Sequence, residues 1–346
     1  MKAAVLVEPG VIEYKTVERP QVHAYEALVQ VKAASICGSD ILRTFHGAAH
    51  YYPLILGHEA AGIVVEVGEG VSADMIGKRV CVAPLIPCMH CSACLREIYS
   101  ACENYSFIGS HQQGCFAEFV AAPVKNLIEL PDAVDYDIGA IIEPATVALH
   151  GLERVAMRPG LSVAVFGTGS VGLCTIQWAR IKGASQIIAV DLVDANLEAA
   201  CALGAKHALN PKVVDVVEQM MALTGEGVDI AVEVSGSPKA LIQVVSIVRP
   251  RGRILCVGNL PVDAQLPSQI VEHLIRQELG MHGTWMSYSA PFPGHEWSDT
   301  LQAVEDDELA MRDIISHRFA LADANQVFQQ INSHTLAHQK IILYPK

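Results

Sequence analysis

The chain has 346 residues, of which 37 are acidic and 24 are basic, so its formal net charge is −13 at pH 7. This sign disfavours nonspecific binding to nucleic acid, although one local Arg or Lys can still bind a small anionic substrate. The length favours two domains, and no apolar run reaches the roughly 18 to 20 residues of a membrane helix. Because the N-terminal segment breaks at Glu8, Pro9 and Gly10 before a signal-type apolar core develops, we expect a cytoplasmic protein without a membrane partner.

The hydrophobic pattern changes near residue 150. Before it, short apolar segments alternate with Gly and Pro, as in "EALVQVKAAS" and "FAEFVAAP", which is typical of antiparallel strands in a sandwich or a partly open barrel. From about Pro159 the pattern becomes apolar strand, glycine turn and longer helix, which indicates βαβ units and a parallel sheet. After about Gly283 the sequence is irregular, until a helical segment at 297–311 and a final strand at 339–345.

A glycine-rich motif opens the second half of the chain. Gly167, Gly169 and Gly172 form G-x-G-x-x-G between an apolar strand and a helix pattern, and Asp191 ends the next apolar strand. Such glycines let the backbone turn and approach a pyrophosphate, while the acidic residue accepts hydrogen bonds from a ribose and repels a 2′-phosphate. The motif therefore predicts NAD rather than NADP, against the alternative of a glycine turn that binds nothing. The expected cofactor contacts are Gly167, Gly169, Ser170, Val171, Gly172 and Asp191.

Four cysteines lie within fifteen residues in the segment "CMHCSACLREIYSAC". The spacing C-x2-C-x2-C-x7-C, without a secretory signal, favours zinc over disulfides. Four thiolates complete a tetrahedral shell and leave no position for a substrate, so this metal is predicted to be structural. Its ligands would be Cys88, Cys91, Cys94 and Cys102. The remaining cysteines are expected to be small buried hydrophobic residues: Cys81, Cys115, Cys174, Cys201 and Cys256.

Chemistry at a metal requires a second, incomplete donor set. Cys37 and His58 offer a thiolate and an imidazole, and Glu59 and Glu143 offer carboxylates, which together leave room for a substrate oxygen. Asp40 is suited to accept a hydrogen bond from the far ring nitrogen of His58 and so fix its tautomer. Taken singly, each residue is more often an ordinary satisfied polar group.

The segment 57–71, "GHEAAGIVVEVGEGV", fits G-H-E-x2-G-x5-G-x2-V, the signature of zinc-containing medium-chain alcohol dehydrogenases. "ICGSD", the four-cysteine segment, "EP" and "GTGSVG" occur in the order of that family, so the sequence resembles it over nearly its whole length. The resemblance implies an α/β protein, with a GroES-like β-rich catalytic domain at 1–150 completed by 285–346, and a Rossmann doubly wound parallel-sheet NAD-binding domain at 151–284. It also implies two zinc ions per chain and a homodimer or homotetramer.

Within the family, glutamates in place of a second cysteine ligand resemble the polyol dehydrogenase branch. The loops "GAAHYYP", "SFIGS" and "GTWMSYSAPFPGHEW" resemble members acting on a phosphorylated hexitol. The implied reaction transfers a hydride from a secondary hydroxyl of galactitol 1-phosphate to NAD and yields tagatose 6-phosphate. Ser39 would relay the proton. Leu42 stands where many relatives carry a histidine, so Glu143, His46 or water would complete the proton route.

Substrate contacts and rival functions stay open at this stage. Arg43, then His46 and Lys340, are candidate anchors for a phosphate, although Arg43 could equally be a solvated surface residue. Trp285 and Tyr288 could form a wall of the substrate cleft or could simply pack. The alternatives are dehydrogenation of an unphosphorylated polyol or amino alcohol, such as sorbitol, xylitol or threonine, and a non-catalytic nucleotide-binding protein on the same scaffold. The retained metal-ligand candidates disfavour the last.

Overall fold

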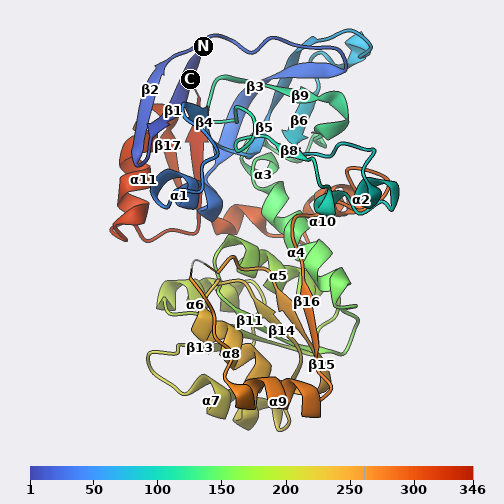
Figure 1. Ribbon diagram of the computed structural model, residues 1–346, viewed down its shortest axis with the longest axis vertical. Helices are drawn as coiled ribbons and strands as arrows, with labels where there is room; N and C mark the ends of the chain where they lie inside the picture. The colour runs from blue at the N-terminus through green and yellow to red at the C-terminus, as the bar shows by residue number, and fades with distance from the viewer. Residues whose placement is uncertain (261, 346) are drawn as a thin grey trace. The chain divides into compact units, whose positions relative to one another are not determined.

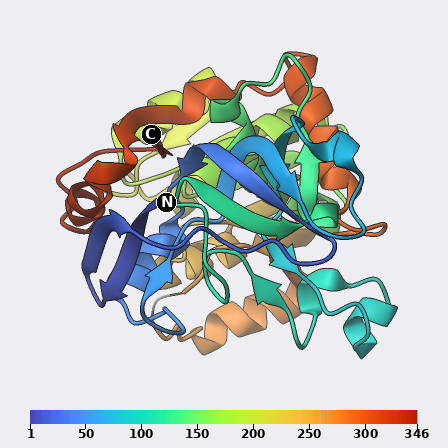
Figure 2. The same cartoon turned by 90° about the horizontal axis from the view of Figure 1, so that it is seen from above.

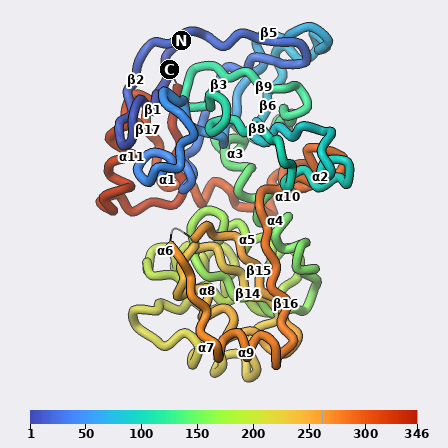
Figure 3. Tube along the Cα trace, in the orientation of Figure 1, coloured from blue at the N-terminus to red at the C-terminus, as the bar shows by residue number. Residues whose placement is uncertain are grey.

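The computed structural model describes residues 1–260 and 262–345. The chain divides into two compact units. The first contains Met1–Glu143, Tyr288–Asp306 and the C-terminal segment from Met311, and the second contains Pro144–Ser287 with Asp307–Ala310. The blue and red ends of the chain thus share one unit, as the trace shows (Figure 3). Among the described residues no helix is long and apolar enough to cross a membrane.

The first unit is built on a seven-stranded sheet in the order β10-β6-β5-β3-β18-β17, with β9 pairing with β3 (Figure 1). All pairs are antiparallel except β17 with β18. The C-terminal strand β18 pairs with β3, with Leu343 opposite Ala34, so the end of the chain completes a sheet begun near its start. The strands are β3 (Glu26–Ser35), β5 (Glu59–Val67), β6 (Arg79–Val82), β9 (Phe119–Pro123), β10 (Leu127–Glu129), β17 (Ile315–Ala320) and β18 (Lys340–Tyr344).

Smaller sheets and short helices surround this sheet (Figure 2). Helix α11 packs against β2 and α1, and its side chains Val327, Phe328 and Ile331 are buried. The small sheets contain β2 (Val11–Thr16), β1 (Lys2–Glu8) and β4 (Leu54–Ile55), and β7 (Leu85–Ile86) with β8 (Ser106–Phe107). The helices are α1 (Gly38–Phe45), α2 (Ser92–Leu95), α3 (Tyr136–Gly139), α10 (His295–Glu305), α11 (Ala324–Asn332), η1 (Ala73–Met75), η2 (Tyr99–Ala101), η3 (Val124–Asn126), η4 (Met311–Ile314) and η5 (Leu321–Asp323).

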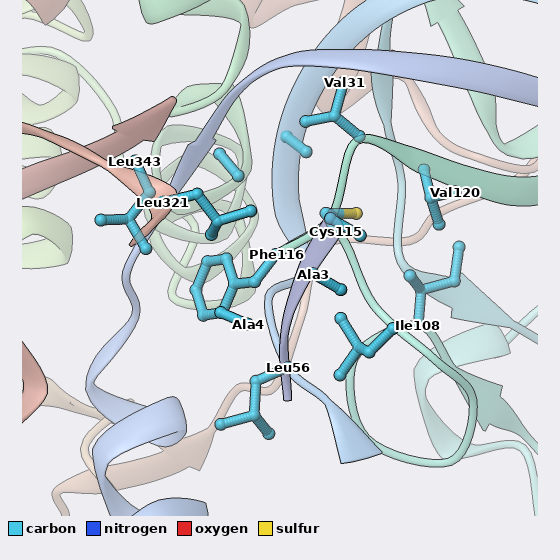
Figure 4. Packing of buried hydrophobic residues seen from close by; sticks show 14 of the residues in the cluster. Ala3, Ala4, Val31, Leu56, Ile108, Cys115, Phe116, Val120, Leu321 and Leu343 are labelled. Carbon is cyan, nitrogen blue, oxygen red and sulfur yellow. The ribbon is translucent and has the colours of Figure 1, made fainter. Parts of the chain in front are cut away.

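The core of this unit joins segments that are far apart in the sequence (Figure 4). Phe116 lies edge-on to Phe328, with 6.0 Å between ring centroids, and burying one such side chain contributes roughly 1.5–3 kcal/mol. Cys115 lies in the same cluster, and burial raises the pKa of its thiol. Cys115 therefore behaves as a small buried hydrophobic residue, as expected.

The second unit contains a six-stranded parallel sheet in the order β13-β12-β11-β14-β15-β16. The order reverses between β11 and β14, which is where doubly wound sheets bind ligands, outside the carboxyl ends of the strands. The strands are β11 (Ser162–Phe166), β12 (Gln186–Val190), β13 (His207–Leu209), β14 (Val228–Glu233), β15 (Val248–Cys256) and β16 (Gly280–Gly283). The helices are α4 (Ile142–Arg154), which begins in the first unit, α5 (Ser170–Ile181), α6 (Asp194–Ala202), α7 (Val216–Thr224), α8 (Pro238–Ser246) and α9 (Ser268–Arg276).

The structure confirms the predicted α/β class, with a β-rich unit and a doubly wound parallel sheet. The central strands of the parallel sheet are apolar along their length because helices cover both faces. One cysteine prediction was wrong: Cys201 is exposed, because it lies on the outward side of α6, whereas Cys174 on α5 is buried. Cys256 is only partly buried.

Candidate metal and nucleotide sites

The first unit brings Cys37, His58 and Glu59 together. Cys37 directly precedes α1, His58 directly precedes β5, and Glu59 is the first residue of β5. One potential ligand atom from each lies within 4.8 Å of the others. The turn that presents His58 depends on Gly57, whose φ is +90° and whose missing Cβ would lie 2.5 Å from the Phe116 ring. Only glycine adopts this backbone in this space without strain, so the G-H-E motif has a local structural cause.

Asp40 contacts two members of this donor set, Cys37 and His58. Its Oδ2 accepts a hydrogen bond of 3.1 Å from the Cys37 backbone N–H, and its Oδ1 lies 3.4 Å from His58 Nδ1, at ion-pair distance rather than in a formed hydrogen bond. This leaves Nε2 of His58 for a metal. Burial lowers the pKa of His58, but the negative charges of Asp40 and Cys37 outweigh it and raise the pKa well above its ordinary value. Such an anionic surrounding fits a cation.

The two carboxylate oxygens of Glu59 differ in their contacts: one has polar partners, and the other has none among the described residues. Its Oε2 contacts the Lys340 ammonium and accepts a hydrogen bond from the Ser35 hydroxyl, whereas its buried Oε1 has no hydrogen-bond partner among the described residues. An orphaned carboxylate oxygen beside a thiolate and an imidazole is a suitable ligand for zinc. Lys340 is only 2% exposed and also donates to the Ile36 carbonyl at 3.2 Å, so it is already bound within the protein.

Glu143 lies in the first turn of α4, close enough to Glu59, His58 and Lys340 for their charges to affect its pKa. Burial and the nearby negative charge of Glu59 together raise the pKa of Glu143 to about 7, against the opposing positive charges of His58 and Lys340. The three-residue donor set does not include Glu143. One thiolate, one imidazole and one carboxylate leave a coordination position open, which is the pattern of a catalytic rather than a structural zinc site.

The four-cysteine segment forms a second, separate donor set. The thiols of Cys88, Cys91, Cys94 and Cys102 lie within 4.8 Å of one another, and Sγ of Cys91 is 3.9 Å from Sγ of Cys102. Tetrahedral zinc with Zn–S bonds of about 2.3 Å requires sulfurs about 3.8 Å apart. Burial and the adjacent thiols raise the pKa of Cys94 to about 12, because four neighbouring thiols cannot all ionise without a cation. The set fits a closed zinc shell.

Ser39 and Arg43 lie on α1 next to the first donor set. Arg43 Nη1 donates to Ser39 Oγ at 2.7 Å and lies 3.5 Å from Asp40 Oδ1, while Arg43 Nε donates to Ser110 Oγ at 3.2 Å. Its side chain is 15% exposed, so Arg43 is not a solvated surface arginine. Because Ser39 Oγ only accepts from Arg43, its own proton remains available to another group.

The two aromatic residues that we considered for the substrate cleft lie in different environments. Tyr288 is 2% exposed, its hydroxyl accepts a hydrogen bond of 3.0 Å from the Leu85 N–H, and its ring stacks on Phe292 with centroids 5.5 Å apart. These contacts favour the packing alternative for Tyr288. Trp285 is 45% exposed.

The glycine motif lies where a nucleotide site requires it, between β11 and α5. Gly169 precedes the first turn of α5, and a Cβ there would meet no atom within 4 Å. Gly172 instead permits close packing, because its Cβ would lie 1.9 Å from the Gly167 carbonyl oxygen. Ser170 and Val171 are the first residues of α5. The N-terminus of this helix therefore offers an anion open space at Gly169 and the positive end of the helix dipole.

A pocket of about 430 Å³ adjoins this turn, and Asp191 lines it. Asp191 Oδ2 accepts hydrogen bonds from Thr168 N–H at 2.7 Å and from Thr168 Oγ1 at 3.0 Å, and its Oδ1 accepts from Val193 N–H at 2.9 Å. These bonds fix the carboxylate at the wall of the pocket. Lys212 and Lys239 also line the pocket, and the glycine motif alone gave no sign of them.

Sequence comparison relates both units to known proteins. Residues 23–132 match the alcohol dehydrogenase GroES-like domain, and residues 170–306 match the zinc-binding dehydrogenase domain. The chain is 33% identical to galactitol 1-phosphate 5-dehydrogenase of Escherichia coli (strain K12), over 100% of both chains. The crystal structure of galactitol-1-phosphate dehydrogenase from Escherichia coli covers 100% of both chains at 33% identity, with a TM-score of 0.95.

Other similar proteins differ in what their names say they act on or bind. Sorbitol dehydrogenase of Bacillus subtilis (strain 168) is 34% identical over 299 residues, which are 85% of this chain and 84% of that one. A zinc-binding dehydrogenase from Sinorhizobium meliloti 1021, solved bound to NADP, is 30% identical and covers 99% of both chains with a TM-score of 0.92. The similarity therefore spans both units.

Proposed function

Because the chain belongs to the zinc-containing medium-chain alcohol dehydrogenase family, in its polyol dehydrogenase branch, we propose that it oxidises a secondary hydroxyl of a sugar-alcohol phosphate and transfers the hydride to NAD. The substrate that we favour is galactitol 1-phosphate, with tagatose 6-phosphate as product. The observation that carries this proposal is the buried set of Cys37, His58 and Glu59, in which Glu59 Oε1 has no partner among the described residues. The full-length similarity to the Escherichia coli enzyme supports the choice of substrate.

Cys37, His58 and Glu59 would hold the catalytic zinc, with Glu143 as a further ligand, direct or through water. Zinc bound there supplies Lewis acidity, which lowers the pKa of a substrate hydroxyl. Ser39 takes the hydroxyl proton at its Oγ while its own proton passes onward, and Arg43 holds that Oγ in place at 2.7 Å. Asp40 fixes the orientation of His58.

The second unit would bind the dinucleotide. Its pyrophosphate would lie over Gly169 and the N-terminus of α5, and its adenosine ribose would contact Asp191 in the adjoining pocket. We propose NAD, because a fixed carboxylate repels a 2′-phosphate. The lysines in the same pocket and the NADP-bound relative make NADP the alternative.

A second candidate function uses the same groups on an unphosphorylated polyol. It is favoured by the identity to sorbitol dehydrogenase, 34% over 85% of this chain, against 33% over 100% of this chain for the galactitol 1-phosphate enzyme. The two candidates share the zinc and nicotinamide chemistry and differ only in what the rest of the substrate offers for recognition.

A substrate panel followed by NADH absorbance tests the proposal. We expect galactitol 1-phosphate to have the highest kcat/KM among galactitol 1-phosphate, sorbitol, xylitol and threonine. A higher kcat/KM for sorbitol would assign the second function. Cys37→Ser should abolish turnover of every substrate and reduce bound zinc from about two ions per chain to about one, and retained turnover would contradict the catalytic role of Cys37. Cys201→Ser, an exposed cysteine in the second unit, is the matched control.

We also propose that the chain forms a homodimer or a homotetramer. Strand β16 is the last strand of the parallel sheet and pairs only with β15 among the described residues. Apolar side chains are exposed on β16, with Met281 at 40%, and on the preceding helix α9, with Val271 at 42% and Ile275 at 66%. A second copy would cover such an edge. Light scattering would show a monomer if this is wrong, and Ile275→Lys should weaken the assembly.

A further inference from the structure

A group of basic side chains lies beside the proposed reaction centre in the first unit. The rings of His50 and His111 lie 4.2 Å apart, tilted by 32°, and the Tyr105 ring meets His111 edge-on at 5.0 Å. Arg43 reaches the same place and donates to Ser110, the neighbour of His111 in the chain. One guanidinium and two imidazoles therefore gather next to a buried hydroxyl.

Several donors of this group are unused. Nδ1 of His111 is buried and has no hydrogen-bond partner, and Arg43 Nη2 donates to no acceptor within the described part of the chain, although Nε and Nη1 are both bound. The Asp40 carboxylate lies 3.5 Å from Arg43 Nη1 and also contacts the Cys37 N–H and His58. Burial lowers the pKa of His111, and the positive charges of His50 and Arg43 lower it further, as expected in a region of positive potential.

We propose that Arg43, Ser110 and His111, with His50 at the exposed edge, form a phosphate-binding subsite for the phosphate monoester of the substrate. This inference rests on the proposed function. Arg43 has one further nitrogen and His111 one buried ring nitrogen to offer to phosphate oxygens, and bonds of this charge-assisted kind are the strong ones. The ligand would be a dianion held at the end of a polyol chain.

A single side chain, that of Arg43, connects the proposed subsite with Ser39, which would contact the reacting hydroxyl of the substrate. Arg43 Nη1 donates to Ser39 Oγ, the proposed proton acceptor, and Nε of the same guanidinium donates to Ser110 Oγ. A substrate whose reacting hydroxyl contacts Ser39 would therefore bring its phosphate beside Ser110 and its chain neighbour His111. The other two candidate anchors are placed less well: Lys340 is buried against Glu59, and His46 is exposed at the C-terminal end of α1.

The test measures selectivity for the phosphate. The ratio of kcat/KM for galactitol 1-phosphate to that for galactitol is determined in the wild type, His111→Asn and Arg43→Lys, each checked by circular dichroism and zinc content. We expect this ratio to fall about 10- to 100-fold in each variant, the equivalent of losing a hydrogen bond to a charged group. His317→Asn is the matched control, because its ring stacks on Phe319 in the same unit, and it should leave the ratio unchanged.

A second measurement does not depend on turnover. Calorimetric titration with inorganic phosphate should show binding to the zinc-replete wild type that is at least about tenfold weaker in His111→Asn and Arg43→Lys. If the wild type prefers galactitol 1-phosphate but both variants keep its ratio and its phosphate affinity, the subsite is wrong and the proposed function stands. If no polyol is oxidised but phosphate affinity falls in both variants, the subsite stands and the proposed function fails.

Discussion

Replacing Lys340 with methionine tests the buried ion pair behind the proposed catalytic metal. The lysine and Glu59 are 2% and 1% exposed, and methionine keeps the length of the side chain without its charge. Breaking a buried pair by removing one partner typically costs about 3–5 kcal/mol, because the other charge stays uncompensated. Ser35 still donates to Glu59, so we expect Lys340→Met to lower the free energy of unfolding by about 3 kcal/mol, near the bottom of that range.

The assay is urea unfolding of zinc-replete protein and of protein dialysed against a chelator. Zinc and Lys340 are both cations that approach Glu59, so bound zinc should offset part of the loss. We therefore expect the loss to be larger in metal-depleted than in zinc-replete protein. The four-cysteine site is the same in both variants, so its contribution cancels from the comparison.

Two variants serve as controls. Lys78→Met breaks an exposed ion pair, in which the Lys78 and Glu129 side chains are 43% and 57% exposed. It should lower the free energy of unfolding much less than Lys340→Met does, because solvent screens such a pair. The double variant Lys340→Met/Glu59→Gln removes both charges and should recover most of the loss. A loss for Lys340→Met no greater than that for Lys78→Met, or no recovery in the double variant, would refute the reasoning.

Three further predictions concern other parts of the molecule. Asp191→Ser should lower the ratio of kcat/KM for NAD to that for NADP by at least about tenfold, because it removes the carboxylate that repels a 2′-phosphate; an unchanged ratio would exclude Asp191 as the discriminating residue. Cys94→Ser should remove about one zinc per chain by elemental analysis and lower Tm by several degrees, whereas undiminished zinc would contradict the closed four-thiolate shell. Burial raises the pKa of Asp229, but hydrogen bonds from Ser162 and the Arg249 guanidinium outweigh this effect, so the pKa is lowered. The ionised Asp229 carboxylate therefore stabilises the folded protein fully above about pH 4, and this contribution is lost as the pH falls through the lowered pKa. Melting curves of Asp229→Asn should then depend less on pH below about 4, and an identical acid limb would count against this pair.

The sequence sufficed wherever the pattern is local. The four cysteines lie within one short segment, Gly57, His58 and Glu59 are consecutive, and the glycine motif is a single turn. The fold class was likewise predictable, because the change from short alternating segments to strand–turn–helix units directly reflects the two kinds of sheet.

What the sequence did not indicate depends on tertiary contacts. Lys340 and Glu59 are 281 positions apart in the sequence (340 − 59), and the pairing of β18 with β3 and of β3 with β5 brings them together. The contact between His50 and His111 likewise joins residues that are distant in the sequence. From the sequence, Tyr288 could equally form a wall of the substrate cleft or pack, and its hydrogen bond from Leu85 favours packing. The prediction that Cys201 is buried was wrong because a single cysteine in a weakly amphipathic helix does not reveal which side of the helix faces the core.

Strand β18 also has a consequence for how the protein matures. The ribosome makes Cys37, His58 and Glu59 early, but their neighbour Lys340 begins the last strand of the chain. Until that strand inserts beside β3, Glu59 has no buried cation to balance it. In the metal-free chain, the ion pair of Glu59 therefore forms only once β18 lies beside β3. Lys340 is not one of the three donors, so the donors and the cation that balances one of them come from opposite halves of the sequence.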